Sequence, residues 1–221
     1  MFVTRIWFWL SLAVALPLNL AVAQQEIPPP GGKGPVVAVI SGQKGADFYQ
    51  PPAQQIASLG YDVVLLDGNA MEGSHGQALH DAILQAQNAP HGQPGKVAVV
   101  GFSLGGGMAL FYATQWPDLV NGIVVWYPLT APISDPAAFV AKIKVPVLMF
   151  AGAQDNYKNC CLIGKANALA AAAAQANAPL TVITYNSAGH DFVFEGQDYD
   201  PVAAPDSWAR AKAALAKYFA P

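Results

Sequence analysis

Short apolar runs alternate with longer stretches of mixed polarity along most of this 221-residue chain. Uninterrupted β-branched and apolar runs are typical of parallel strands that are buried on both faces. The predicted strands span residues 36–40, 62–67, 97–100, 122–126, 145–151 and 180–185. Predicted helices span residues 51–59, 74–87, 108–115, 136–143, 162–176 and 206–219. This alternation predicts one α/β domain, with a mainly parallel sheet of at least six strands and helices on both faces.

The first 23 residues have the three-part pattern of a secretory signal peptide. Arg5 is followed by an apolar stretch at 6–20 and by the small-residue site Ala21-Val22-Ala23. We expect cleavage before Gln24 and export to the periplasm or the medium, with no stable membrane span left afterwards. An uncleaved anchor helix is the alternative, although the apolar stretch is short for a full span.

Residues 24–35 are expected to form a flexible leader, because they contain a proline and glycine cluster and no hydrophobic period. The folded domain is therefore expected to cover residues 36–221. Its length suffices for one sizeable core.

The motif Gly101-Phe102-Ser103-Leu104-Gly105 directly follows a predicted strand and precedes a predicted helix. A serine on such a sharp turn needs glycine two positions away on either side, since larger side chains would collide. The turn exposes the hydroxyl and places it beside the positive end of a helix. A glycine-rich turn that only packs or that binds phosphate is the alternative, but the Lys-Ser or Lys-Thr pair of a phosphate loop is missing.

Ser103, Asp155 and His190 each follow a different predicted strand, in the order nucleophile, acid, histidine. A serine hydroxyl becomes nucleophilic when a base removes its proton, and a carboxylate holds that base in the correct tautomer. Asp67 and Asp191 are alternative acids. Asp67 precedes the serine, however, and Asp191 adjoins the histidine too closely to orient its ring. The three residues are therefore the predicted catalytic triad.

The oxyanion hole is expected to consist of the backbone N–H groups of Leu104 and Gln43, the second of which lies in the turn after the first predicted strand. Lys44 in the same turn offers a positive charge or faces solvent. Apolar and aromatic residues near strand ends are candidates for the substrate-binding wall or for core packing: Met71, Phe102, Trp126, Tyr127, Tyr157 and Phe192.

Composition excludes several partners and cofactors. The formal net charge is −3, and Arg210 is the single arginine after residue 23, so nucleic acid is not an expected partner. His75, His80 and His91 are expected on the surface, and no histidine or cysteine spacing indicates a metal site. Neither metal nor organic cofactor is expected. The adjacent Cys160 and Cys161 could be a strained disulfide, a link to another chain or, the favoured interpretation, two buried thiols.

The chain resembles the dienelactone hydrolase-like branch of the α/β-hydrolases. The resemblance extends over residues 36–219 and is carried by the segments 101–106, 152–155, 188–192 and 199–208. It implies a compact α/β-hydrolase fold without a large cap domain. The family's namesakes use a cysteine nucleophile and arginines that hold a substrate carboxylate, whereas this chain has Ser103 and no arginine near a predicted site loop.

We therefore expect an exported serine hydrolase that cleaves small carboxylic ester or lactone bonds through an acyl-enzyme intermediate. Two alternatives remain open at this stage: a non-catalytic binding protein that keeps the fold, and a hydrolase of peptides or polymers. The sequence does not determine the oligomeric state.

Overall fold

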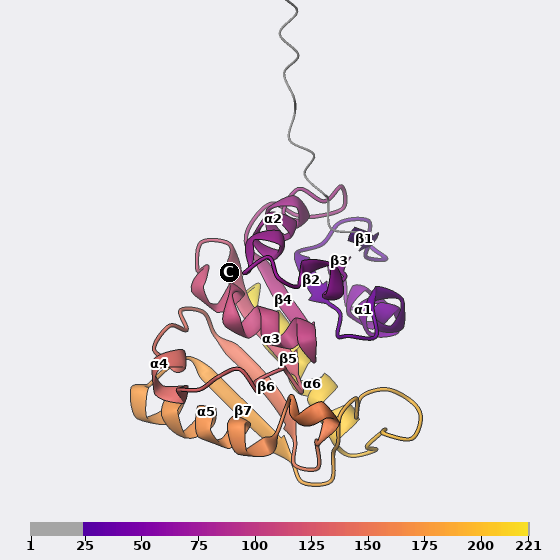
Figure 1. Ribbon diagram of the computed structural model, residues 1–221. Helices are drawn as coiled ribbons and strands as arrows, with labels where there is room; N and C mark the ends of the chain where they lie inside the picture. The colour runs from indigo at the N-terminus through magenta and orange to yellow at the C-terminus, as the bar shows by residue number, and fades with distance from the viewer. Residues whose placement is uncertain (1–23, 221) are drawn as a thin grey trace, which may run out of the picture.

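A seven-stranded sheet in the order β1-β3-β2-β4-β5-β6-β7 forms the centre of the protein in a computed structural model that describes residues 24–220 (Figure 1). The predicted signal peptide and Pro221 lie outside the described residues. The strands are β1 Gln24–Ile27, β2 Val36–Ile40, β3 Asp62–Leu66, β4 Val97–Phe102, β5 Val120–Trp126, β6 Val147–Gly152 and β7 Leu180–Tyr185. The α-helices are α1 Gln50–Ala57, α2 Gln77–Ala86, α3 Leu104–Phe111, α4 Pro136–Val140, α5 Ile163–Ala176 and α6 Ala203–Tyr218.

Strands β2 to β7 pair in parallel, which confirms the predicted mainly parallel sheet with helices on both faces. Strand β1 is a correction, because residues 24–27 were expected to lack regular structure. It pairs antiparallel with β3 at the sheet edge, and most of it is partly exposed. An edge strand of sequence Gln-Gln-Glu-Ile is stabilised by main-chain pairing more than by burial, so it leaves no hydrophobic pattern to detect.

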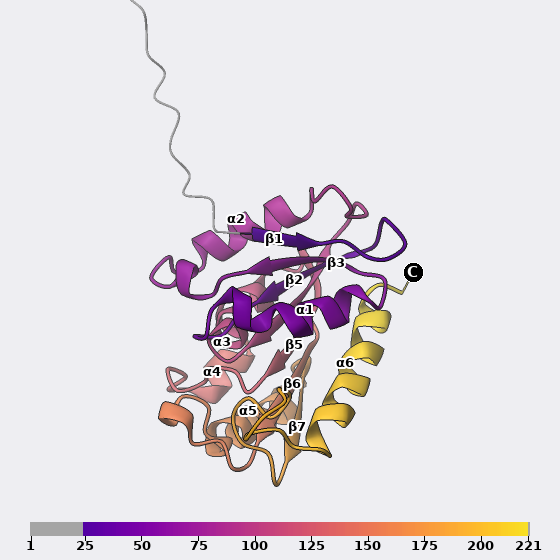
Figure 2. The ribbon, with the colours of Figure 1, turned by 90° about the vertical axis from the view of Figure 1, so that its right-hand side faces the viewer.

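Two apolar cores lie on opposite faces of the sheet. Helices α1 and α6 cover one face with residues such as Ile56 and Leu215. Helices α2 to α5 cover the other face, to which Ile83, Met108 and Leu169 belong. Figure 2 shows α6 on one side of the sheet and α3 and α4 on the other. Strands β2 to β6 are therefore buried on both faces, as their apolar sequences predict.

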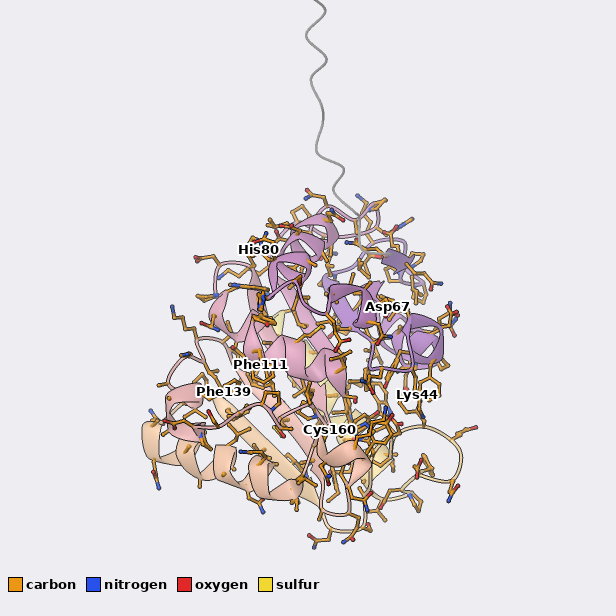
Figure 3. The ribbon with its side chains drawn as sticks, in the orientation of Figure 1. Lys44, Asp67, His80, Phe111, Phe139 and Cys160 are labelled. Atoms are coloured by element: carbon orange, nitrogen blue, oxygen red, sulfur yellow. A yellow bond between two sulfur atoms is a disulfide. The ribbon has the colours of Figure 1, made fainter. Side chains whose placement is uncertain are left out.

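Helices α3 and α4 lie side by side. The ring of Phe111 packs edge-to-face against that of Phe139 at 5.5 Å between centroids (Figure 3). Only residues 127–146 connect β5 to β6, and their single α-helix, α4, has five residues. The segment where a cap domain would be inserted is therefore short, as expected.

Helices α2, α3 and α6 begin three or more residues from their predicted starts; α6 begins at Ala203 rather than at Asp206. Helix α2 begins at Gln77 rather than near Ser74, because Gly76 adopts a left-handed conformation with φ 88°. Helix α3 begins at Leu104, directly after Ser103, although its first turn contains three glycines. A Cβ atom on Gly107 would lie 2.8 Å from Leu129, so the glycine lets α3 lie close to the 127–130 loop.

The sheet has its topological switch point between β2 and β4. The chain passes from β2 to β3 on one side and then returns to form β4 on the other side of β2. Loops that follow two such strands diverge and leave a crevice at their carboxyl ends, where ligands of open α/β sheets bind. The loops that carry Gln43 and Ser103 follow β2 and β4.

A buried hydrogen bond joins α6 to the centre of the sheet. The Nε1–H of Trp126 in β5 donates to Oγ of Ser207 at 3.0 Å, and the Ser207 hydroxyl donates to the carbonyl of Ala204 at 2.9 Å. Both side chains are fully buried. No helix within residues 24–220 is long and apolar enough to cross a membrane.

We predict that Ser207→Ala destabilises the protein by about 1–3 kcal/mol, since it leaves the buried indole N–H without its acceptor. Ser58→Ala is the matched control, because the exposed Ser58 hydroxyl donates to Gln55 of its own helix. Urea unfolding of both variants measures the difference. Equal midpoints for Ser207→Ala and Ser58→Ala would show that the indole hydrogen bond contributes nothing.

Candidate active site

Ser103 lies at the turn between β4 and α3 with a strained backbone conformation, φ 51° and ψ −113°. The surrounding main chain holds it there. Its N–H donates to the carbonyl of Trp126 at 3.0 Å, and its carbonyl accepts from the N–H of Leu129 at 2.8 Å. Non-glycine residues with positive φ persist where neighbouring structure fixes them, and they are frequent at functional sites.

The two glycines that flank Ser103 are required by close backbone contacts. A Cβ atom on Gly101 would lie 2.7 Å from the carbonyl oxygen of Gly105. A Cβ atom on Gly105 would lie 2.4 Å from the carbonyl oxygen of Ile40 and 2.6 Å from that of Ser41. The glycine spacing of the sequence motif therefore reflects the packing of α3 against β4 and against the end of β2.

Ser103, His190 and Asp155 are joined by two hydrogen bonds. The serine Oγ lies 3.0 Å from Nε2 of His190, and Nδ1 of His190 lies 2.7 Å from Oδ2 of Asp155. With the Asp155 carboxylate accepting from Nδ1–H, Nε2 is left as the acceptor that faces the serine hydroxyl. The side chains of His190 and Asp155 are 9% and 1% exposed, so the arrangement is shielded from bulk water.

The loops after β6 and β7, which carry Asp155 and His190, are bonded to each other by their backbones. The N–H of Ala153 donates to Tyr185 and that of Gln154 to Ala188, both at 2.9 Å. At Gly152 a Cβ atom would lie 2.4 Å from the Ala188 carbonyl oxygen, so the two loops approach as closely as glycine permits. This contact fixes the distance between acid and base.

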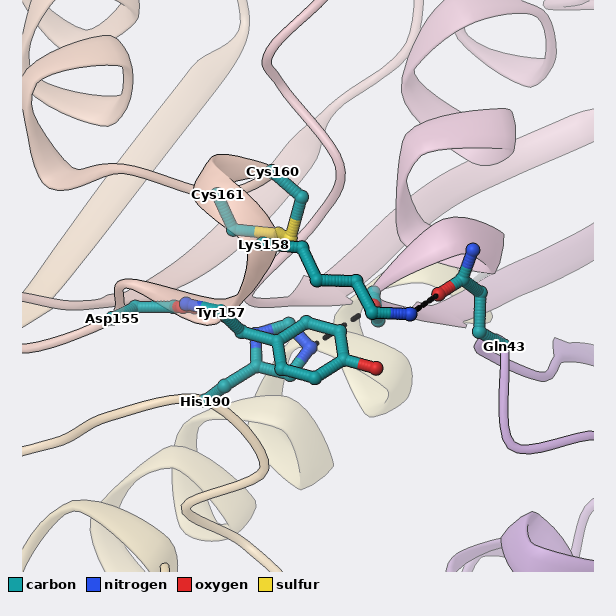
Figure 4. The surroundings of a disulfide bond; sticks show 8 residues. Gln43, Asp155, Tyr157, Lys158, Cys160, Cys161 and His190 are labelled. Carbon is teal, nitrogen blue, oxygen red and sulfur yellow. Dashed lines mark hydrogen bonds and ion pairs between the residues drawn. A yellow bond between two sulfur atoms is a disulfide. The ribbon is translucent and has the colours of Figure 1, made fainter.

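Two tyrosines hold the imidazole ring of His190. The ring of Tyr157 stacks on it at 4.6 Å with an interplanar angle of 13° (Figure 4). The ring of Tyr127 lies 4.7 Å from it between centroids. Both were candidates for the substrate-binding wall. Tyr127 is 1% exposed, so it contacts the imidazole from within the core, and burial raises the pKa of its hydroxyl well above the usual value. Tyr157 also lines the cavity at Ser103.

The two alternative acids serve other contacts. The Asp191 carboxylate pairs with Nζ of Lys44 at 2.9 Å, which gives the charge of Lys44 a partner within the protein. Oδ1 of Asp67 accepts from the N–H of Asn69 at 2.9 Å, in the loop after β3. The imidazole of His190 therefore has Asp155 as its hydrogen-bonded carboxylate.

Gln43 and Leu104, the predicted oxyanion residues, line one small cavity with Ser103, of about 120 Å³. Between residues 24 and 220, no hydrogen bond occupies the backbone N–H of either one. Gly42 keeps the β2 loop close, since a Cβ atom there would lie 3.0 Å from Cβ of Ser103. The two N–H groups are thus positioned beside the serine and available to a ligand.

Several residues of this cavity were missed by the sequence analysis: Glu72, Leu129, Lys158 and Cys160. Nζ of Lys158 donates to Oε1 of Gln43 at 3.1 Å, which joins the loop after β6 to the loop after β2 (Figure 4). Lys158 has φ 48° and Asn159 φ 53°. A positive φ is not visible in a single sequence when the residue is not glycine.

A second, apolar trough of about 260 Å³ adjoins the cavity and shares Glu72, Leu104 and Leu129 with it. Its other lining residues include Met71, which was predicted to contact substrate, and Met108 and Phe111 of α3. The three shared residues place the trough next to the cavity that Ser103 lines.

The prediction that Phe102, Trp126 and Phe192 form a substrate wall is wrong. All three are 0% exposed and belong to the core on the α1 and α6 face of the sheet. The ring of Phe102 stacks on that of Trp126 at 5.0 Å. Side chains of a strand alternate between its two faces, so the residue before the serine points into the core, while Ser103, itself 5% exposed, lines the cavity.

Cys160 and Cys161 form a disulfide, so the favoured prediction of two buried thiols is wrong. The pair follows the left-handed residues Lys158 and Asn159. The carbonyl of Cys160 accepts from the N–H groups of Thr130 and Ala131, both at 2.9 Å. This turn, which the sequence does not reveal, brings adjacent side chains together at the wall of the cavity.

Comparison with known proteins gives a family and several relatives. The profile of the dienelactone hydrolase family matches residues 66–219. The chain is 28% identical over 145 residues to "Protein usf" of Aquifex pyrophilus, an alignment that covers 62% of this chain and 60% of that protein. The chain thus spans about 60% of the length of this curated relative.

Solved structures share the fold. A dienelactone hydrolase-like promiscuous phosphotriesterase from metagenomic libraries has a TM-score of 0.70 at 19% identity, over 90% of this chain and 100% of that one. Apo Thermogutta terrifontis esterase 2 has a TM-score of 0.67 at 15% identity, over 90% and 91%. At such identities the likeness shows the α/β-hydrolase fold.

The matched profile and the Ser103–His190–Asp155 geometry lead to one conclusion: the chain belongs to the dienelactone hydrolase family.

Proposed function

We propose that the protein is an exported serine esterase, which hydrolyses small, neutral carboxylic esters or lactones. The observation that carries the proposal is the continuous hydrogen-bonded chain from the Ser103 hydroxyl through the imidazole of His190 to the Asp155 carboxylate. This chain supplies the nucleophile, base and orienting acid that acyl transfer requires.

In the acylation step, Oγ of Ser103 attacks the ester carbonyl carbon while Nε2 of His190 takes the hydroxyl proton. The N–H groups of Leu104 and Gln43 donate hydrogen bonds to the tetrahedral oxyanion. These hydrogen bonds strengthen as negative charge develops on the oxygen in the transition state. The imidazolium then returns its proton to the departing alkoxide, and Asp155 stabilises the transient positive charge.

In the deacylation step, a water molecule gives a proton to Nε2 of His190 and attacks the acyl-serine carbonyl. Collapse of the second tetrahedral intermediate releases the carboxylic acid and restores the Ser103 hydroxyl. The original hydroxyl proton of Ser103 leaves with the alcohol and a proton from water replaces it, so the cycle needs ester and water alone. In a lactone the leaving alkoxide stays attached to the acyl group, and the product is a hydroxy acid.

The lining of the site supports a neutral substrate with an apolar arm. Leu104, Leu129 and Met108 line the trough next to the cavity that Ser103 lines. The nearby Lys44 is paired with Asp191. We infer that the acyl chain lies in the trough, where each buried methylene contributes about 0.8 kcal/mol.

Export is part of the proposal. It is supported by the signal-like pattern of residues 1–23 and by the disulfide, since disulfides persist in oxidising compartments.

We predict that Ser103→Ala lowers turnover of p-nitrophenyl acetate by roughly 10⁴- to 10⁶-fold and abolishes labelling by a fluorophosphonate probe. Ser58→Ala, an exposed serine, should retain both. A folded wild-type protein that neither hydrolyses esters nor takes the label would favour a non-catalytic binding protein. Faster cleavage of aminoacyl amides than of esters would favour a peptide hydrolase.

The same assay separates the two aspartates near His190. Asp155→Asn should lower turnover by roughly 10⁴-fold, because an amide stabilises the wrong imidazole tautomer. Asp191→Asn should cost far less, since its carboxylate contacts Lys44. The reverse order of the two effects would contradict the assignment.

We predict that kcat/KM rises about fourfold for each methylene added between p-nitrophenyl acetate and p-nitrophenyl butyrate. This factor corresponds to the burial free energy of about 0.8 kcal/mol per methylene. Met108→Trp fills the trough and should remove this rise while leaving acetate hydrolysis within about threefold. Gln55→Trp, in a separate groove beside α1, is the control. A rise that survives Met108→Trp would place the acyl chain elsewhere.

We predict that the full-length chain, expressed in a bacterial host, appears outside the cytoplasm with Gln24 as its first residue. Fractionation and intact mass measure both. A protein without residues 2–23 should stay in the cytoplasm. A mass that retains residues 1–23 in a membrane fraction would indicate the anchor helix instead.

A further inference from the structure

Three potential metal ligands meet at the end of the sheet opposite to the catalytic loops. They are Glu26 of β1, Asp62 at the start of β3, and His91 in the loop between α2 and β4. One ligand atom from each residue lies within 4.8 Å of the other two. Because the three residues are far apart in sequence, no motif spacing could have revealed the cluster.

Asp62 is the unusual member of the cluster. It is 0% exposed, and no donor group within residues 24–220 reaches either of its carboxylate oxygens; the carboxyl of Glu26 lies within hydrogen-bond reach only when one of the two carries a proton. The other buried aspartates of that range, Asp155, Asp191 and Asp200, each have at least one partner. A buried carboxylate without partners is costly, so this one requires an explanation.

The charges of the three side chains match a divalent cation. Two carboxylates and a neutral imidazole carry two negative charges, which a divalent cation would balance.

The backbone holds the three side chains in place. The N–H of His91 donates to Oε1 of Glu26 at 3.0 Å. The His91 carbonyl accepts from Gly34 at 3.0 Å, and the N–H of Asp62 donates to the Pro35 carbonyl at 3.0 Å. The loop of His91 is therefore fixed against the segment that leads into β2, and the ligands are arranged before any ion arrives.

We propose that Glu26, Asp62 and His91 bind one divalent transition-metal ion, with Zn²⁺ the best match. Zn²⁺ takes mixed nitrogen and oxygen ligands at about 2.0–2.2 Å, which places tetrahedral ligand atoms about 3.4 Å apart. Oε1 of Glu26 and Nδ1 of His91 are already 3.0 Å apart. The ion takes the lone pair of Nδ1, the imidazole proton moves to Nε2, and water fills the fourth position.

The ion reaches the site from the solvent side. The side chains of His91 and Glu26 are 44% and 25% exposed, whereas Asp62 forms the buried base. Bound there, the metal would join the edge strand β1, the strand β3 and the loop before β4. The site is structural and separate from Ser103, so ester hydrolysis does not depend on it.

The test uses the mature chain, freed of metal by chelator and dialysis. Addition of Zn²⁺ should raise the melting temperature by about 5 °C or more at saturating metal, with one ion bound per chain by calorimetry. Mg²⁺ and Ca²⁺ should give smaller shifts, because they disfavour imidazole. No shift and no stoichiometric binding would overturn the proposal, and Asp62 would then keep a proton instead.

Asp62→Asn removes the buried charge at nearly constant shape and should abolish the shift. Asp81→Asn is the matched control, since Asp81 is an exposed carboxylate 3.6 Å from His80. Should Asp62→Asn fail to fold, His91→Gln at a partly exposed position gives the same readout. Binding that survives Asp62→Asn or His91→Gln, or that is lost with Asp81→Asn, would contradict the assigned ligands. Esterase activity should be unchanged by chelator.

Discussion

The close approach of α3 to the ends of β2 and β4 is the constraint on which the site depends. Gly105 lies so near the carbonyls of Ile40 and Ser41 that no side chain fits. This contact accompanies the strained backbone of Ser103 at the start of α3, and it keeps the end of β2 beside the serine. Ser103 and the loop of Gln43, the proposed nucleophile and the proposed second oxyanion donor, thus lie together at the switch point of the sheet. The strain at Ser103 is offset by the apolar core beneath it.

The histidine is positioned by a different means. No glycine-rich turn holds His190; instead its ring lies between Tyr157 and Tyr127, and its loop is bonded to the Asp155 loop through backbone groups. Aromatic packing restricts the ring to one orientation, and the carboxylate then selects its tautomer. Tyr127 contributes through burial rather than through its hydroxyl, which has no hydrogen-bond partner within residues 24–220.

The fold and the triad could be predicted from the sequence because both leave local signals. Apolar runs mark the buried parallel strands, and the carboxyl ends of those strands meet at one edge, so Ser103, Asp155 and His190 could be expected together. The predictions that were wrong are those that depend on the direction of a side chain or on rare backbone conformations. Phe102 faces the core because strand residues alternate. The Cys160–Cys161 disulfide depends on the left-handed Lys158 and Asn159. Strand β1 and the contacts of His91, which was expected to be a plain surface residue, arise from pairing between distant segments.

The charges around Ser103 bear on the kind of substrate that the site can take. The family's namesakes hold a substrate carboxylate with arginines. Here the one arginine of residues 24–220, Arg210, pairs with Asp206 on α6. The charge of Lys44 is matched by Asp191 at 2.9 Å, and Lys158 shares the cavity wall with Glu72. A carboxylate substrate would have to compete with these anions for each lysine, and it would lose its hydration. The free-energy cost of this desolvation exceeds the stabilisation that an ion pair with a half-exposed lysine provides. A neutral ester meets no such cost. The balance of charge around Ser103 therefore supports the proposal of a neutral ester that binds through apolar contacts in the trough.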